Sequence, residues 1–159
     1  MKRFSGPCSI ICRDGVVSVS EGKLKEVSSF FANECGRKGK AGVILEDLEV
    51  ETEVVTLALW FLFDIHSKKP REIFALPRLE EMFDFLEKYQ FYYEKVGNAF
   101  SSRCRETKDY EDTLEFSDST KRPFAHQIAR SCAEKMLQTF RDRDAERKER
   151  DDWNPMFDR

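Results

Sequence analysis

The order of apolar runs in the N-terminal part of this chain constrains its fold more than any other feature. Two β-rich runs, 9–12 and 16–19, flank Asp14-Gly15, a pair typical of tight hairpin turns because glycine tolerates the backbone angles that such turns need. A helical pattern follows, then the apolar run 42–48, and then a second helical pattern that ends at Phe63. The sequence therefore predicts a hairpin, a helix, a third strand and another helix in one continuous stretch.

Both predicted helices carry apolar side chains at positions that indicate burial. Ser20 can cap the first helix, because its hydroxyl can accept a hydrogen bond from an amide of the first turn. The second helix is apolar at nearly every position from Val54 to Phe63. A helix that is apolar all round is either buried on all sides or covers a partner. The apolar face of the first helix consists of Leu24, Val27, Phe30 and Phe31.

The polarity of the chain changes twice in its C-terminal third. An apolar part is followed by an acidic linker with at most one weak helical turn, and then by a long helix and a short tail. The long helix has an apolar stripe at first, but from Arg141 its charges alternate in sign, which is typical of a solvated helix. Further helices are expected at 77–89 and 91–104. We therefore expect a domain over 8–104, a linker over 105–123, a charged helix over 124–150 and a tail over 151–159.

The overall charge argues against a nucleic-acid partner. The 159 residues include 27 basic and 30 acidic side chains, and the net charge is −3, whereas nucleic-acid binders usually have a clustered basic excess. No apolar run reaches the ~20 residues that a transmembrane helix needs, and the N-terminus lacks the pattern of a signal peptide. We therefore expect neither nucleic acid nor membrane among the partners, and a cytoplasmic or nuclear location.

Residues that carry chemistry are scattered along the chain. His66 and His126 have no nucleophile in a motif beside them, and the acidic run 46–53 lacks the glycine and the ligand spacing of a calcium loop. We expect no catalytic residue, no cofactor and no metal site. An enzyme that uses His66 or the acidic run stays open as an alternative. We expect free thiols in a reducing compartment from the five cysteines, Cys8, Cys12, Cys35, Cys104 and Cys132.

Aromatic residues are unusually frequent, with fourteen phenylalanines in the chain. They crowd its middle third, where two interpretations stay open. The side chains could fill a phenylalanine-rich core, or some of them could cover a surface for self-association or for a partner. Exposed apolar patches of several hundred Å² usually mark such a surface.

The region around the first helix resembles the signature of the BTB/POZ domain. In that signature a leucine is followed by a serine four positions later and by an aromatic residue three positions after the serine, as in Leu24, Ser28 and Phe31. The preceding hairpin, the run 44–47 and the segment Leu86–Gln90 are also similar in order and spacing. The resemblance implies an α+β fold with a three-stranded sheet, made of the N-terminal hairpin and a third strand, flanked by a helical cluster. A long C-terminal helix would follow it.

The resemblance also implies a non-enzymatic protein–protein interaction module. BTB/POZ domains often form homodimers through the first helix and the apolar surface beside it, so we expect self-association and recruitment of protein partners. The alternative is a ubiquitin-ligase adaptor subunit of the Skp and elongin type, with a cullin-type scaffold as its partner. The residues expected to anchor the core or the interface are Leu24, Val27, Phe31, Trp60 and Phe63.

Overall fold

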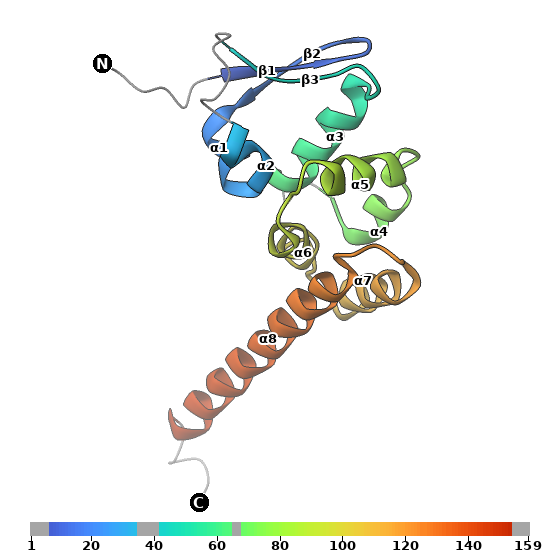
Figure 1. Ribbon diagram of the computed structural model, residues 1–159. Helices are drawn as coiled ribbons and strands as arrows, with labels where there is room; N and C mark the ends of the chain where they lie inside the picture. Colours follow the sequence, from blue (N-terminus) through green and yellow to red (C-terminus); the bar gives the residue numbers. More distant parts are fainter. Residues whose placement is uncertain (1–6, 35–41, 65–67, 154–159) are drawn as a thin grey trace, which may run out of the picture.

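The computed structural model describes residues 7–34, 42–64 and 68–153. It confirms the predicted α+β class, with a three-stranded sheet, a cluster of helices and a long C-terminal helix (Figure 1). The strands are β1 (Pro7–Cys12), β2 (Gly15–Ser20) and β3 (Val43–Asp47). The helices are α1 (Glu21–Val27), α2 (Ser29–Glu34), α3 (Thr52–Phe63), α4 (Pro70–Phe74), α5 (Leu79–Lys88), α6 (Tyr93–Ser101), α7 (Thr107–Ser119) and α8 (Ala125–Trp153).

The sheet has the strand order β2-β1-β3 and is mixed. The predicted hairpin pairs β1 with β2 in antiparallel fashion, and β3 lies parallel to β1 on the other side. In β1 the side chains of Cys8, Ile10 and Cys12 are buried, whereas Ser9 and Ile11 are only partly covered. Because alternate side chains of a strand point to opposite faces, the helices cover one face of the sheet, as Figure 1 shows.

The hairpin turn is tied directly to the start of α3. The Asp14 carboxylate accepts hydrogen bonds from the Thr52 amide at 2.8 Å and from the Thr52 hydroxyl at 3.1 Å. The first amides of a helix have no partner within the helix, so the turn supplies the cap that α3 needs. This contact fixes the apolar helix beneath the sheet.

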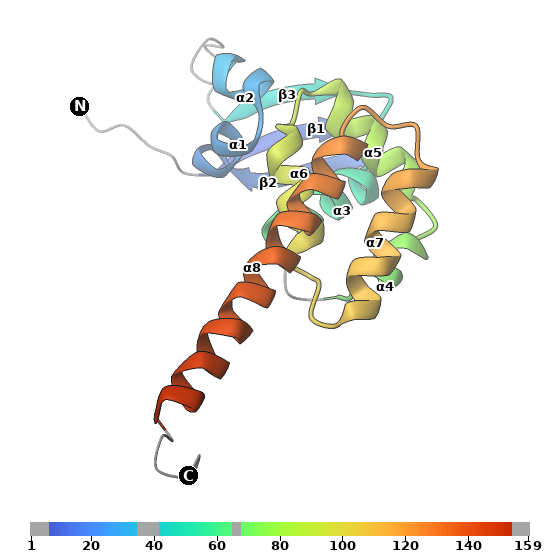
Figure 2. The same ribbon diagram turned by 90° about the horizontal axis from the view of Figure 1, so that it is seen from below.

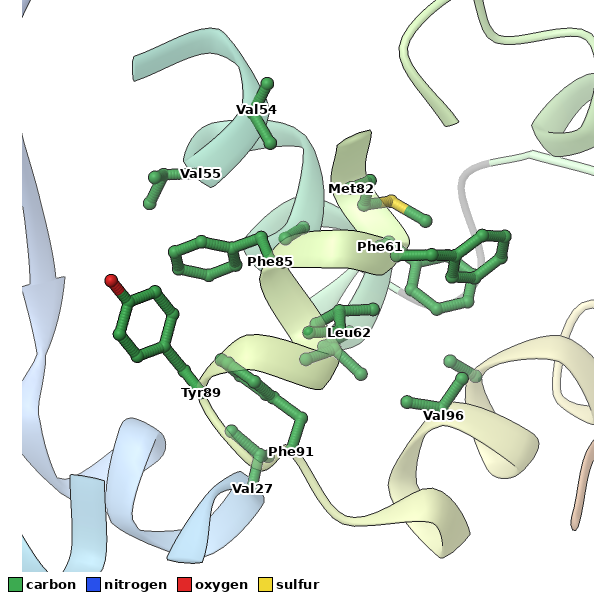
Figure 3. Close-up of a cluster of buried hydrophobic side chains, with 14 of the residues drawn as sticks. Val27, Val54, Val55, Phe61, Leu62, Met82, Phe85, Tyr89, Phe91 and Val96 are labelled. Carbon is green, nitrogen blue, oxygen red and sulfur yellow. The ribbon is translucent and has the colours of Figure 1, made fainter. Parts of the chain in front are cut away.

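Most of the aromatic side chains lie in one core between the sheet and the helices. Figure 3 shows how side chains of α3, α5 and α6 converge there, among them Phe61, Met82 and Val96. A row of rings continues from this core toward α7, where Phe116 stacks on Phe74 with ring centres 4.4 Å apart. The interpretation of a phenylalanine-rich core therefore accounts for most, though not all, of these residues.

The prediction that residues 105–123 form a linker with at most one weak helical turn is wrong, because this segment contains a full helix. Helix α7 begins where the Asp109 carboxylate accepts hydrogen bonds from the amides of Arg105 and Glu106, at 2.8 and 3.0 Å. Its few anchors are long-range: Phe116 joins the row of rings, and Thr113 is completely buried. The polar composition of the segment did not indicate this helix, because the helix is stabilised by packing against α4 and α8.

The predicted long helix is confirmed as α8. Its first half packs on α6 and α7, and its second half projects from the rest of the molecule in both views (Figures 1 and 2). Every residue from Arg141 to Arg150 is exposed, as the alternating charges predict. Within the described residues, no helix is both long and apolar enough to cross a membrane.

Helices α6 and α8 approach each other closely at a glycine. A Cβ atom on Gly97 would lie 2.6 Å from Ser131 Oγ and 2.8 Å from the Gln127 carbonyl oxygen. Both distances are shorter than real carbon–oxygen contacts. The lack of a side chain at residue 97 therefore permits the short distance between the two helices.

Candidate interaction surface

The five predicted anchor residues do not lie together on one surface. Leu24, Val27 and Phe31 are buried in the core of the monomer. Trp60 is half-buried, and Phe63 is 37% exposed. The first three therefore hold the fold together, and only the two residues of α3 are available to a partner.

A break in the first helix explains why Phe31 turns inward. The sequence predicts one continuous helix, but Ser28 has extended backbone angles (φ −144°, ψ 127°) and separates α1 from α2. Its hydroxyl donates to the Tyr89 carbonyl oxygen and accepts from the Phe31 amide at 3.2 Å. A further hydrogen bond joins the Tyr92 amide to the Val27 carbonyl at 2.8 Å. The break thus anchors both short helices to the end of α5.

The same tyrosine also contacts the end of β3. The Tyr89 hydroxyl donates to the Asp47 carboxylate, and Lys88 Nζ lies 2.9 Å from it. Burial alone would raise the pKa of Asp47, but the hydrogen bonds from Lys88 and Tyr89 outweigh burial and lower that pKa. Burial, and then Asp47, raise the pKa of Tyr89. Three segments that are distant in the sequence therefore meet at one joint, which we call the Ser28–Tyr89–Asp47 joint.

One face of α3 is left partly uncovered by the rest of the chain. Thr56, Leu59, Trp60 and Phe63 follow the spacing that places residues on a single helix face, and each of them is half-buried or exposed. We call these four residues the α3 strip. The Lys23 ammonium of α1 lies 5.4 Å from the centre of the Phe63 ring, so α1 borders the strip. Helical spacing places these four residues on one face, but the sequence does not show that this face is left uncovered.

A buried arginine holds the end of α3 that carries the strip. Arg103, 2% exposed, donates to the carbonyl oxygens of Phe61 at 2.9 Å, Asp64 at 3.0 Å and Ala99 at 2.6 Å. Its guanidinium also lies 5.3 Å from the centre of a Trp60 ring. Burial lowers the pKa of Arg103 to about 10, so the group remains charged at neutral pH. No signal in the sequence distinguished this arginine from the surface ones.

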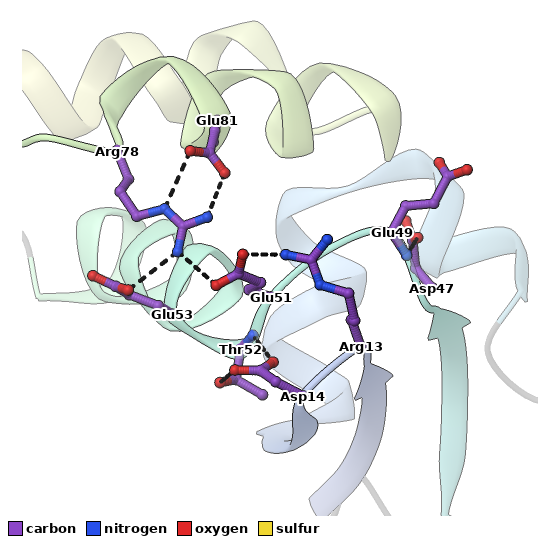
Figure 4. Close-up of polar contacts among 9 residues, drawn as sticks. All are labelled: Arg13, Asp14, Asp47, Glu49, Glu51, Thr52, Glu53, Arg78 and Glu81. Carbon is purple, nitrogen blue, oxygen red and sulfur yellow. Dashed lines mark hydrogen bonds and ion pairs between the residues drawn. The ribbon is translucent and has the colours of Figure 1, made fainter.

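The acidic run is engaged with cations of the protein itself (Figure 4). Arg78 Nη1 lies 2.9 Å from Glu51 and 3.1 Å from Glu53, and the same guanidinium pairs with Glu81. Arg13 forms a further pair with Glu51. A cavity of about 310 Å³ lies beside this network. Among the described residues no group of three or more acidic, cysteine or histidine side chains could hold a metal ion.

Of the two histidines, only His126 lies within the described residues. His126 is exposed near the start of α8, as expected for a surface histidine. His66, on which the enzyme alternative depends, lies outside the described residues.

A scan against protein-family models, a search of curated proteins and a search of solved structures returned no match. Membership of the BTB/POZ family therefore stays a prediction.

Proposed function

We propose that this chain is a non-enzymatic protein–protein interaction module of the BTB/POZ type that pairs with a second copy of itself. The observation that supports this proposal is the Ser28–Tyr89–Asp47 joint. The three segments that resemble the family signature, around Ser28, at the end of β3 and at Leu86–Gln90, are those that meet there. Residues that belong to one signature are expected to stabilise one shared piece of structure.

The α3 strip is the surface that we assign to the second copy. Aromatic side chains that are half-exposed on a helix, such as Trp60 and Phe63, are the type that most often carries the binding free energy of an interface. A stable pair would bury about 800 Å² on each partner. The strip alone is smaller than this area, so the adjoining surface of α1 would have to contribute.

The charges beside the strip suit pairing between identical surfaces. The partly or fully exposed charges of α1 are two acidic residues, Glu21 and Glu26, and two basic residues, Lys23 and Lys25. In a two-fold symmetric pair the same patch meets itself. A patch of one sign would repel its copy, whereas this patch is neutral overall and permits opposite charges to face each other.

The end of α3 is also tied to the inside of the monomer by hydrogen bonds. Arg103 bonds the last carbonyl oxygens of the helix and contacts the Trp60 ring from inside the molecule. A side chain that is already ordered loses less conformational entropy on binding. The hydrogen bonds of Arg103 therefore favour a well-defined interface over a loose apolar patch.

The test is the mass of the full-length chain in solution, measured by light scattering over a range of concentrations. We expect the mass to rise toward that of a dimer at tens of micromolar. Phe63→Asp should weaken the pairing by at least about tenfold, since burial of a phenylalanine contributes ~2 kcal/mol. Phe140→Asp is the matched control, because Phe140 is 50% exposed on α8 and lies outside the strip; it should leave the mass unchanged.

Two results would contradict the proposal. A wild-type chain that remains monomeric at every concentration would remove self-association. Loss of pairing in Phe140→Asp but not in Phe63→Asp would place the interface on α8. The adaptor alternative predicts a monomer that is captured by a cullin-type scaffold, so a pull-down with that scaffold separates the two functions.

A further inference from the structure

Two buried thiols meet at a distance from the main core, where α6, α7 and α8 come together. Cys104 follows α6 and Cys132 lies in the first half of α8, and both side chains are almost completely buried. The two thiols belong to one small cluster of buried residues, together with Tyr110 of α7. Cys104 Sγ also lies 3.6 Å from Thr113 Oγ1 of α7. Both cysteines are free, as the sequence predicts, but they form a pair that their separation in the sequence did not reveal.

The surroundings of the pair assign different roles to the two sulfur atoms. The neighbouring Cys132 thiol, Thr113 and the cation of Lys135 lower the pKa of Cys104, although burial and Asp109 oppose this effect. The neighbouring Cys104 raises the pKa of Cys132, and burial adds to the rise. Cys104 is therefore the sulfur that more readily becomes a thiolate, the reactive form of cysteine, and Cys132 retains its proton.

Lys135 is held in position beside the pair. Its ammonium group donates to the Ser101 carbonyl oxygen at 2.8 Å and to the Cys104 carbonyl oxygen at 3.1 Å. These bonds connect α8 to the last residue of α6 and to the segment that follows it. The cation is thus fixed near Cys104 by the backbone, independently of the sulfur chemistry.

The apolar cluster around the two thiols is much smaller than the main core. The thiols belong to a small separate cluster with Tyr110, and among the described residues the partly buried apolar side chains packed against it are Leu114 and Met136. Regions with few buried apolar contacts open locally at a lower free energy than global unfolding requires. Movement of α7, which contributes Tyr110, Thr113 and Leu114 to the surroundings of the pair, would admit a small oxidant.

We propose that Cys104 and Cys132 are a modification site at which a hydroperoxide forms a reversible disulfide. The Cys104 thiolate attacks the hydroperoxide, so that a sulfur–oxygen bond forms, the oxygen–oxygen bond breaks, and the leaving alkoxide or hydroxide takes up a proton. Cys132 then attacks the sulfenic acid on Cys104; the sulfur–sulfur bond forms, the sulfur–oxygen bond breaks, and water leaves with the Cys132 proton. Two thiols are oxidised and one peroxide is reduced.

The disulfide would fasten α8 to the end of α6 by a covalent bond. A dithiol reductant reverses the reaction through two thiol–disulfide exchanges, in which it becomes a disulfide itself. The same contact between α6 and α8 would then exist in a closed, cross-linked form and in an open, reduced form. Oxidation of this pair would control how firmly α8 is held.

The test treats the reduced full-length chain with hydrogen peroxide, blocks the remaining thiols by alkylation and maps the peptides by mass spectrometry. We expect a Cys104–Cys132 peptide that has lost two hydrogen atoms and that a dithiol restores. Cys8 and Cys12 serve as controls within the same molecule, because burial raises the pKa of both thiols; they should remain reduced and react with the alkylating agent once the chain is unfolded. Oxidation without this disulfide, pairing with Cys35 in its place, or equally fast oxidation of the controls would overturn the proposal.

Variants test the order of the two steps. Cys132→Ser should stop the reaction at a sulfenic acid on Cys104, which dimedone captures, whereas Cys104→Ser should give no capture at Cys132. Lys135→Met should slow the oxidation of Cys104 several-fold without changing which residues are cross-linked. Circular dichroism establishes that each variant is folded, and the wild-type experiment decides the proposal even where a variant does not fold. Capture at Cys132 in place of Cys104 would contradict the assigned roles.

Discussion

Replacing Gly97 with alanine tests the packing of α8 on the rest of the fold. The added methyl group would lie 2.8 Å from the Gln127 carbonyl oxygen and 2.6 Å from Ser131 Oγ. The serine side chain can rotate, although it then gives up the hydrogen bond that it accepts from Gln127 at 3.2 Å. The backbone oxygen cannot move without α8, so the two helices must separate by about 0.5 Å to restore a normal contact.

Two effects of opposite sign determine the magnitude. Alanine stabilises a helix by about 1 kcal/mol relative to glycine. Overpacking of a close contact costs ~1–3 kcal/mol, and here the upper part of that range applies because one contact is with backbone. We therefore expect a net loss of about 1–2 kcal/mol in the free energy of unfolding. For a chain of this length, that loss lowers Tm by roughly 2–8 °C.

The assay is urea unfolding of the full-length chain followed by circular dichroism, with Asn98→Ala as the control. Asn98 is exposed on the same helix, so its replacement should change stability by no more than about 0.5 kcal/mol. Adding Ser131→Ala to the Gly97 variant should restore only part of the loss, because the clash with the Gln127 carbonyl remains. If Gly97→Ala were as stable as Asn98→Ala, the close approach of α6 and α8 would be refuted.

Two further predictions concern the Ser28–Tyr89–Asp47 joint. Ser28→Ala should lower the free energy of unfolding by about 1–3 kcal/mol, because it leaves buried backbone groups without a partner; Ser18→Ala, exposed on β2, should change little in the same urea titration. Asp47→Asn should be less stable than the wild type at neutral pH. Its deficit should shrink as the pH falls below about 4, since a carboxylate with a lowered folded pKa stabilises only while it is ionised; a deficit that is constant from pH 7 to pH 2.5 would show that Asp47 is not the titrating group.

Local signals in the sequence were sufficient where local structure decides the outcome. The Asp14-Gly15 hairpin, the third strand, the apolar helix α3 and the long helix α8 all follow from turn residues and spacing, and all are present. The break at Ser28 was missed because nothing beside it in the sequence ends a helix. Its cause is a hydrogen bond to Tyr89, a residue that only the folded chain brings near.

The candidate surface was only partly predictable for a related reason. Hydrophobic spacing places Leu24, Phe31 and Trp60 on helix faces equally well, but it does not say which faces the rest of the chain covers. Phe31 is covered because the break at Ser28 turns α2 toward Tyr89 and Phe91. Trp60 lies on the face of α3 whose residues are half-buried or exposed, the α3 strip.

The exposed second half of α8 projects from the rest of the molecule over a fixed length. A helix rises about 1.5 Å per residue, so the part of α8 beyond Phe140 extends ~20 Å from the packed body. Ion pairs along the helix, such as the one from Arg147 to Asp144 at 2.8 Å, favour a straight rod in this solvated stretch. The distance from a fluorophore or spin label at Arg150 to the sheet would therefore depend on the orientation of a rod of known length. Any change in how α8 packs on α6 would displace the C-terminal end of the helix by a larger distance.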